Sequence, residues 1–130
     1  MNSEEIYIEQ NYFFFDSYAF FELLKGNPSY EKYKKVAIVT TKLNLFELYL
    51  GLLRDINEEI AEKYFDKYYI YIKEFDENVI KQAAKLKNKL NKRDLSMTDS
   101  IGYIFAKQLG IKFLTGDKEF ENLDNVEFVK

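Results

Sequence analysis

The sequence predicts an α/β fold whose sheet is mostly parallel and is covered by helices on both faces. Two observations lead to this prediction. Short apolar runs such as 12–15 (YFFF) and 36–39 (VAIV) are typical of strands that are buried on both faces. These runs alternate with longer segments whose apolar residues recur at helical spacing, which is the pattern of βαβ units.

Residues that end and begin helices divide the first part of the chain. Gly26 follows residues 18–24, which have helical spacing, and is the expected left-handed residue beyond that helix. Asn27 and Pro28 have the positions of an N-cap and a first helical residue, so a second helical segment is expected to begin there.

The middle of the chain is expected to be largely helical. Residues 41–54 form a predicted helix that is apolar nearly all round, which indicates a buried helix. Residues 57–67 continue the helical pattern, and the run 69–72 (YIYI) favours a strand.

The last part returns to strands. Asp76 is the expected cap of a long amphipathic helix. Its apolar face consists of Val79, Ile80, Ala83, Leu86 and Leu90. Gly110 is expected to end a helix over 99–109. The remaining expected elements are the strand 111–114, the helical turn 117–120 and the strand 126–129.

Composition narrows the possible functions. The chain has 130 residues, 47% hydrophobic and 18% aromatic, which predicts a single folded domain over residues 1–130. It has no apolar run long enough for a membrane helix and no signal peptide at its acidic N-terminus, so a cytoplasmic location is expected. The net charge of −3 argues against a bulk basic nucleic-acid binder, and the Lys, Glu, Ile and Tyr content leans thermophilic.

The sequence contains neither cysteine nor histidine. This excludes thiolate chemistry, a serine nucleophile activated by histidine, and the usual zinc ligands. A metal ion in this protein must therefore be held by oxygen ligands, which suit Mg²⁺, Mn²⁺ or Ca²⁺.

Four acidic residues are expected near one edge of the sheet. Asp16 directly follows the first strand, and Asp117 comes shortly after the strand 111–114. Asp99 opens the helix that leads into that strand, so it points back to the same edge. Ligands of open parallel sheets lie beyond the carboxyl ends of the strands. Glu47 is the fourth acid, in an apolar helix where a charge is unexpected.

Each acid also has a simpler interpretation. Asp16 is a plausible helix N-cap, Asp99 suits the helix dipole with Thr98 as the cap, and Asp117 fits a turn. Glu47 fits least well, because no cation lies three or four residues from it in the helix. If Glu47 is buried, it needs a partner from elsewhere in the fold.

Four converging carboxylates repel one another, and divalent cations would resolve the repulsion. Mg²⁺ takes oxygen ligands, and two such ions can activate a water and stabilise the leaving oxygen of a phosphodiester. This chemistry requires no histidine, so metal-dependent phosphodiester hydrolysis is the class of hydrolysis that the composition favours.

The order of the motifs resembles the PIN domain family, in particular the VapC-type toxins, over residues 12–129. The motifs are FFFDSYAFFELLKG, LNLFELYLGLLR, SMTDSIGYIFAKQLG and KFLTGDKEF. The resemblance implies a three-layer α/β/α sandwich with a five-stranded, mostly parallel sheet. It implies Asp16, Glu47 and Asp99 as catalytic, metal-binding acids, Asp117 as a fourth and more variable acid, and Thr115 as a supporting hydroxyl.

The same resemblance implies an activity and partners. The expected activity is a Mg²⁺- or Mn²⁺-dependent endoribonuclease that hydrolyses RNA, the toxin of a type II toxin–antitoxin pair. The expected partners are a second copy of the chain and a small antitoxin, whose C-terminal segment enters the acidic groove and presents an arginine to the carboxylates.

The sequence departs from the pattern in two places, and its RNA-binding residues are not obvious. Residues 1–11 form an atypical N-terminal extension in which Ile6 and Ile8 alternate with polar residues, as in an edge strand. Gly102 and Tyr103 stand where small residues are common. A basic run before the Asp99 helix is the visible candidate for RNA contacts, although such runs are more often solvated. It consists of Lys87, Lys89, Lys92 and Arg93.

Other functions stay open. The same site would serve a PIN-type nuclease in RNA maturation, and the aromatic content would also suit a non-catalytic interaction module. Phosphoaspartate enzymes fit worse. A haloacid-dehalogenase-like phosphatase needs an acid at the position of Tyr18, and a receiver needs an Asp after the third strand, where Lys73 and Glu74 follow Ile72.

Overall fold

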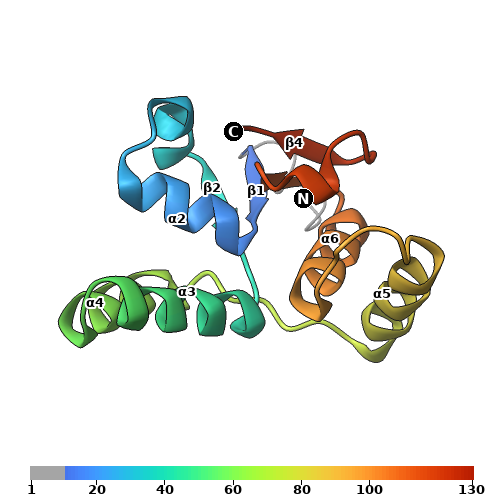
Figure 1. Cartoon of the computed structure of the whole chain (residues 1–130), viewed down its shortest axis with the longest axis horizontal. Coiled ribbons are helices and arrows are strands. Elements are labelled where there is room, and N and C mark those ends of the chain that lie inside the picture. The colour runs from blue at the N-terminus through green and yellow to red at the C-terminus, as the bar shows by residue number, and fades with distance from the viewer. Residues whose placement is uncertain (1–10) are drawn as a thin grey trace, which may run out of the picture.

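The computed structural model of the chain describes residues 11–130 and contains an α/β fold with one parallel sheet (Figure 1). The sheet has four strands in the order β2-β1-β3-β4, and every neighbouring pair is parallel. The strands are β1 (Tyr12–Phe15), β2 (Ala37–Val39), β3 (Lys112–Thr115) and β4 (Val126–Phe128). The predicted fold class is confirmed.

Helices connect the strands. The α-helices are α2 (Ser17–Lys25), α3 (Lys42–Asp55), α4 (Glu58–Tyr69), α5 (Glu77–Lys89) and α6 (Met97–Leu109). Two 3₁₀ segments are η1 (Pro28–Lys34) and η2 (Lys118–Phe120). The predicted end residues are confirmed, because Gly26 and Gly110 have φ values of 78° and 73°. Asp76 caps α5 by accepting a hydrogen bond from the Val79 N–H. None of these helices has the length and apolar character needed to cross a membrane.

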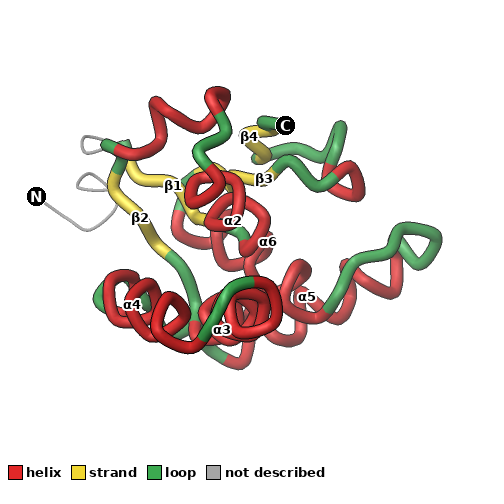
Figure 2. The backbone as a smooth tube through the Cα atoms, turned by 60° about the vertical axis from the view of Figure 1, so that its left-hand side comes forward, coloured by secondary structure: helices red, strands yellow, loops and turns green. Residues whose placement is uncertain are grey.

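The alternating phenylalanines of β1 divide the core into two halves. Phe13 and Phe15 pack with residues of α2, η1, α3 and α4 in one apolar cluster. Phe14 faces the other way and packs with Phe113 and with residues of α5 and α6 in a second cluster. The sheet therefore lies between two helical layers, as Figures 1 and 2 show.

The strand favoured by residues 69–72 does not form. Tyr69 is the last residue of α4, and Ile72 makes only an isolated parallel bridge with Thr40, just beyond β2. The helix α4 extends through Tyr69, the first residue of this segment. The high β propensity of the segment is therefore expressed only in the bridge between Ile72 and Thr40. The described residues therefore contain a four-stranded sheet instead of five strands.

The prediction that α3 is buried is only half right. Leu45, Leu48 and Leu52 are in the core, whereas Phe46 is 66% exposed and Leu50 is 47% exposed on the other side. The helix packs mainly against α4 and α2, and no element of the described chain covers its opposite face. The sequence of α3 is apolar on all sides. That pattern alone does not show whether every side of the helix is buried or one apolar side is left exposed.

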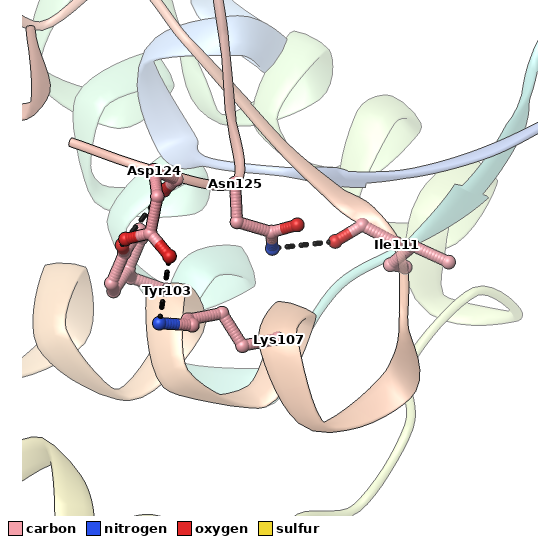
Figure 3. Close-up of polar contacts among 5 residues, drawn as sticks. All are labelled: Tyr103, Lys107, Ile111, Asp124 and Asn125. Atoms are coloured by element: carbon pink, nitrogen blue, oxygen red, sulfur yellow. Dashed lines mark hydrogen bonds and ion pairs between the residues drawn. The ribbon is translucent and has the colours of Figure 1, made fainter. Parts of the chain in front are cut away.

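The large Tyr103 is accommodated by pointing away from the carboxyl edge of the sheet. Its hydroxyl donates to the carbonyl and carboxylate of Asp124, in the loop before β4 (Figure 3). Lys107 also contacts the Asp124 carboxylate, and Asn125 donates to the Ile111 carbonyl. These contacts attach the β4 loop to α6. Gly102 leaves room for the Phe14 ring, since a Cβ there would lie 2.9 Å from Phe14 Cε1.

Residues 1–10, which make up nearly all of the predicted N-terminal extension with Ile6 and Ile8, lie outside the described residues.

Candidate functional site: an acidic cleft at the carboxyl edge

The carboxylate of Asp16 lies at the end of β1 and is almost fully buried, with 2% of the residue exposed. Its Oδ2 accepts a 2.8 Å hydrogen bond from the Thr115 hydroxyl at the end of the neighbouring strand β3. The other oxygen, Oδ1, is buried without a hydrogen-bond partner among the described residues. Asp16 occupies the N-cap position of α2, as the simpler interpretation predicted, but its side chain makes no capping hydrogen bond to the helix.

Glu47 is half-buried and is held by a chain of polar side chains. Its Oε1 accepts a 2.6 Å hydrogen bond from the Ser17 hydroxyl, which in turn accepts one from the amide of Asn44. The side-chain oxygen Oδ1 of Asn44 accepts a hydrogen bond from the Thr41 hydroxyl. The partner of Glu47 thus comes from another element, α2, and is a neutral hydroxyl instead of a cation.

Asp99 is fixed at the N-terminus of α6 by a capping box. The Ser96 side chain accepts from the Asp99 N–H, and Asp99 Oδ2 accepts from the Ser96 N–H at 3.0 Å. The N-cap is therefore Ser96, and the prediction of Thr98 as cap is wrong. Thr98 is already inside the helix and is buried. The capping box orients the carboxylate at the positive end of the helix dipole.

Asp117 combines a structural role with a position at the cleft. Its Oδ1 accepts from the Glu119 N–H and so caps η2, which agrees with the predicted turn. Its own N–H donates to the Thr115 hydroxyl at 3.1 Å. Thr115 therefore connects Asp117 to Asp16 through one buried oxygen.

The structure brings the four predicted acids to a single cleft of about 350 Å³, which we call the acidic cleft. Its lining consists of Asp16, Ser17, Tyr18, Phe21, Glu47, Leu50, Arg54, Asp99 and Asp117. Thr115 lies beneath it, fully buried, and orients Asp16. Acids from β1, α3, α6 and the β3–η2 turn thus share one opening.

Burial and mutual repulsion disturb the ionisation of two of these acids. Burial raises the pKa of the Asp16 carboxyl well above its usual range, and the charges of Asp99 and Glu47 add to the rise. Burial also raises the pKa of Asp99, with further contributions from Asp117 and Glu47, against hydrogen bonds from Ser96 that lower it. The cleft therefore disfavours full ionisation unless positive charge enters it.

The donor set fits a hard divalent cation. All candidate ligands are carboxylate oxygens, and Asp16 Oδ1 is a buried acceptor that has no hydrogen-bond partner within residues 11–130. Within residues 11–130, no three acidic side chains lie close enough together to bind one metal ion in this structure. Carboxylate oxygens are the ligands that Mg²⁺ takes, and this ion is usually held by one or two carboxylates with several waters in the rest of its coordination.

Sequence reasoning missed the residues that hold the acids in place. Ser17 and Asn44 orient Glu47, and Ser96 orients Asp99. Ser17 could have been identified from its position directly after Asp16 at the end of the strand. Asn44 could have been identified because it lies one helical turn before Glu47. The basic run that was a candidate for RNA contacts is partly used within the protein, since Lys87 donates a hydrogen bond to the Leu95 carbonyl.

Solved structures with this fold include several toxins. The toxin VapC20 of Mycobacterium tuberculosis, described as cleaving the sarcin–ricin loop, has a TM-score of 0.76 and 16% identity, over 91% of this chain and 99% of that chain. VapBC-1 of nontypeable Haemophilus influenzae has a TM-score of 0.69 and 19% identity, over 90% of this chain and 96% of that chain. A toxin–antitoxin complex from Klebsiella pneumoniae has a TM-score of 0.67 and 14% identity, over 87% of this chain and 93% of that chain.

At these low sequence identities the similarity concerns the fold alone. A search of curated proteins found no match to the sequence. The sequence profile of the PIN domain, by contrast, matches residues 13–126 and so includes all four acids of the cleft. Because this match extends over most of the chain, the chain belongs to the PIN domain family.

Proposed function

We propose that this protein is a metal-dependent endoribonuclease and the toxin of a type II toxin–antitoxin pair. One observation carries the proposal: Asp16 Oδ1 is buried, has no hydrogen-bond partner within residues 11–130, and lies in a cleft shared with Glu47, Asp99 and Asp117. Burying a carboxylate oxygen without a hydrogen-bond partner costs free energy, and a cation bound to that oxygen would offset the cost.

The residues present would hold Mg²⁺ or Mn²⁺ through Asp16 and Asp99, with Glu47 and Asp117 completing the negative site. When bound, a divalent ion neutralises charge on a phosphodiester and lowers the pKa of an attacking water. The Thr115 hydroxyl holds the Asp16 carboxylate in place, and the Ser17 hydroxyl does the same for Glu47. Fixed ligands of this kind are the supporting contacts on which metal sites depend.

RNA as the substrate, and the toxin role, are proposed from the structural neighbours. VapC20 is a toxin that cleaves the sarcin–ricin loop, and other neighbours are toxin–antitoxin complexes. The uncovered face of α3 favours a protein partner, because Phe46, Leu50 and Leu53 form an exposed apolar stripe at i, i+4 and i+7 beside the cleft. We propose that an antitoxin segment covers this stripe and presents an arginine to the acids.

A homodimer is also proposed. A second apolar depression, of about 260 Å³, lies between α5 and α6. Two of its lining side chains, Ile80 and Met97, are 50% and 60% exposed. If this surface joins two copies, Met97→Glu would shift the sedimentation of the protein from dimer to monomer, whereas Phe46→Glu on α3 would leave it a dimer.

Metal binding is the first test. Titration calorimetry with Mn²⁺ should detect binding to the wild-type protein and little or none to Asp99→Asn, since the capping box survives in Asn but the charge does not. Wild-type cleavage of RNA in Mn²⁺, lost in the same variant, would support the nuclease. A wild-type protein that binds no Mn²⁺, even with a short RNA present, would contradict it and favour a non-catalytic interaction module.

A further inference from the structure

Arg54 is the cation that lines the acidic cleft, and neither the fold nor the four acids account for it. It lies in the last turn of α3, seven residues after Glu47 and four after Leu50. Residues at i, i+3 and i+7 share one face of a helix, so Glu47, Leu50 and Arg54 point to the same side. At 1.5 Å per residue, Arg54 is about 10 Å along the helix from Glu47.

The Arg54 guanidinium is available for a ligand. Within residues 11–130 its polar contact is the one from Nε to Asp55, its neighbour in sequence, at 3.1 Å. Both side chains are well exposed, at 67% and 61%. An ion pair between exposed neighbours contributes at most about 1 kcal/mol, so it offers little resistance to a competing anion.

The other arginine of the chain is used differently. Arg93 donates to the backbone carbonyls of Glu119 and Glu121, and so holds the turn around η2. Arg54 donates to no backbone carbonyl of the described chain, and its side chain is well exposed and lines the cleft.

The cleft wall between the acids and Arg54 suits a nucleotide. Phe21 and Leu50 line it, and Gly51 lets the Phe21 ring lie directly against α3, since a Cβ on Gly51 would clash with Phe21 Cζ. A short length of extended RNA can bridge the distance from the acids to Arg54. Aromatic and apolar side chains with a nearby guanidinium are what single-stranded nucleic acid uses for stacking and phosphate contact.

We infer that Arg54 is a phosphate-binding residue that positions the RNA strand next to the bond to be cleaved, on the Phe21–Leu50 wall of the acidic cleft. The inference rests on the proposed nuclease function and adds to it the positive contact that four acids cannot supply. It makes Arg54 a positioning residue, since its guanidinium is two helical turns from Glu47.

The test measures RNA binding without cleavage. A short fluorescein-labelled oligouridylate is titrated with the Asp99→Asn protein in Mg²⁺, followed by fluorescence anisotropy over a range of salt concentrations. In that background Arg54→Ala should weaken binding by about tenfold or more, the scale of a hydrogen-bonded charged contact. The slope of log K against log salt should shrink by about 0.7, which is the value for one phosphate contact on a single strand.

Two further variants identify the cause of any change. Arg54→Lys should keep the salt slope but recover only part of the affinity, because lysine offers a point charge without the planar fork. Lys35→Ala changes the net charge by the same amount at the opposite, amino edge of the sheet, just before β2. Screening at about 0.1 M salt acts over about 10 Å, so this control should bind RNA as the background protein does. Melting temperatures of all variants should match.

Three results would overturn the inference, and they differ in what else they affect. Binding and salt slope unchanged in Arg54→Ala, with wild-type cleavage intact, would remove the role of Arg54 and leave the proposed nuclease. Equal weakening in Arg54→Ala and Lys35→Ala would show a general charge effect in place of a contact. Absence of both binding and cleavage in the wild-type protein would overturn the proposed function together with the inference.

Discussion

The Asp16 carboxylate and the Thr115 hydroxyl, 99 positions apart in the sequence, are joined by a 2.8 Å hydrogen bond between fully or almost fully buried side chains. This bond links the ends of the two central strands, β1 and β3, at the floor of the acidic cleft. It leaves one Asp16 oxygen committed to the protein and the other free of a described hydrogen-bond partner. Removing the hydroxyl would therefore test both the fold and the site.

Thr115→Val should destabilise the protein by about 1–3 kcal/mol, because it leaves Asp16 Oδ2 and the Asp117 N–H without their partner. It should also weaken Mn²⁺ binding by about tenfold or more, as loss of a supporting contact does at metal sites. Chemical denaturation and calorimetry measure the two effects. Thr115→Ser keeps the hydroxyl and should keep the Mn²⁺ affinity, and equal affinity in Val and Ser variants would contradict the supporting role.

Ser17→Ala should have a similar effect on Glu47. The substitution removes the donor to Glu47 Oε1 and leaves the buried amide of Asn44 without its acceptor. We expect a loss of about 1–3 kcal/mol in unfolding free energy and a drop in RNA cleavage at unchanged overall fold. The matched variant Ser29→Ala removes an exposed hydroxyl in η1, far from the cleft, and should change neither property. Full cleavage by Ser17→Ala would show that Glu47 needs no orientation from α2.

Asp99→Asn should raise the melting temperature of the metal-free protein. The pKa of Asp99 is raised by burial and by the neighbouring acids, so its charged form is unfavourable in the folded state. Asn keeps the acceptor for the Ser96 N–H while removing the charge. A gain of about 1 kcal/mol corresponds to roughly 4 °C in Tm for a domain of this size. A clear fall in Tm by calorimetry in EDTA would count against repulsion in the cleft.

Stability without metal should fall as the pH rises. Burial raises the pKa of Asp16 to about 8, against about 3.9 in the unfolded chain, so the folded state retains a proton that the unfolded state loses. This contribution is fully present below about pH 4 and is lost as the pH rises through about 8. Asp16→Asn should flatten the dependence of Tm on pH.

Added Mg²⁺ should act in the opposite direction to this pH effect. The ion binds the ionised carboxylates, so it should raise Tm more at pH 8 than at pH 6 by preferential binding to the folded state. Thermal melts over this pH range, with Mg²⁺ and with EDTA, give the comparison. A Tm in EDTA that is flat with pH and equal in wild type and Asp16→Asn would contradict the assignment of the raised pKa.

The sequence was sufficient to predict what depends on short-range pattern. The apolar run at 12–15 predicted a buried strand, and the rule of carboxyl edges then brought Asp16 and Asp117 to one side of the sheet. The helix ends at Gly26 and Gly110 followed from the conformational freedom of glycine. These features require only local backbone preference and the direction of the strands.

Features that depend on tertiary packing were not predictable in the same way. The segment 69–72 has high β propensity, yet α4 extends through Tyr69 and only Ile72 pairs with Thr40. The hydrogen bond between Ser17 and Glu47 joins two helices, and no spacing along the chain encodes it. Whether Phe46 is covered depends on neighbours that hydrophobicity alone does not reveal.

The position of β3 in the middle of the sheet has a consequence for the timing of activity during translation. Asp16, Glu47 and Asp99 all precede β3, which begins at Lys112 and supplies the hydroxyl that holds Asp16. A nascent chain that ends before Lys112 contains three of the four acids, but it lacks Asp117 and β3, which is one of the two strands that pair with β1. The cleft therefore cannot be completed on a ribosome that has not yet synthesised the last part of the chain, and premature termination yields a product without it.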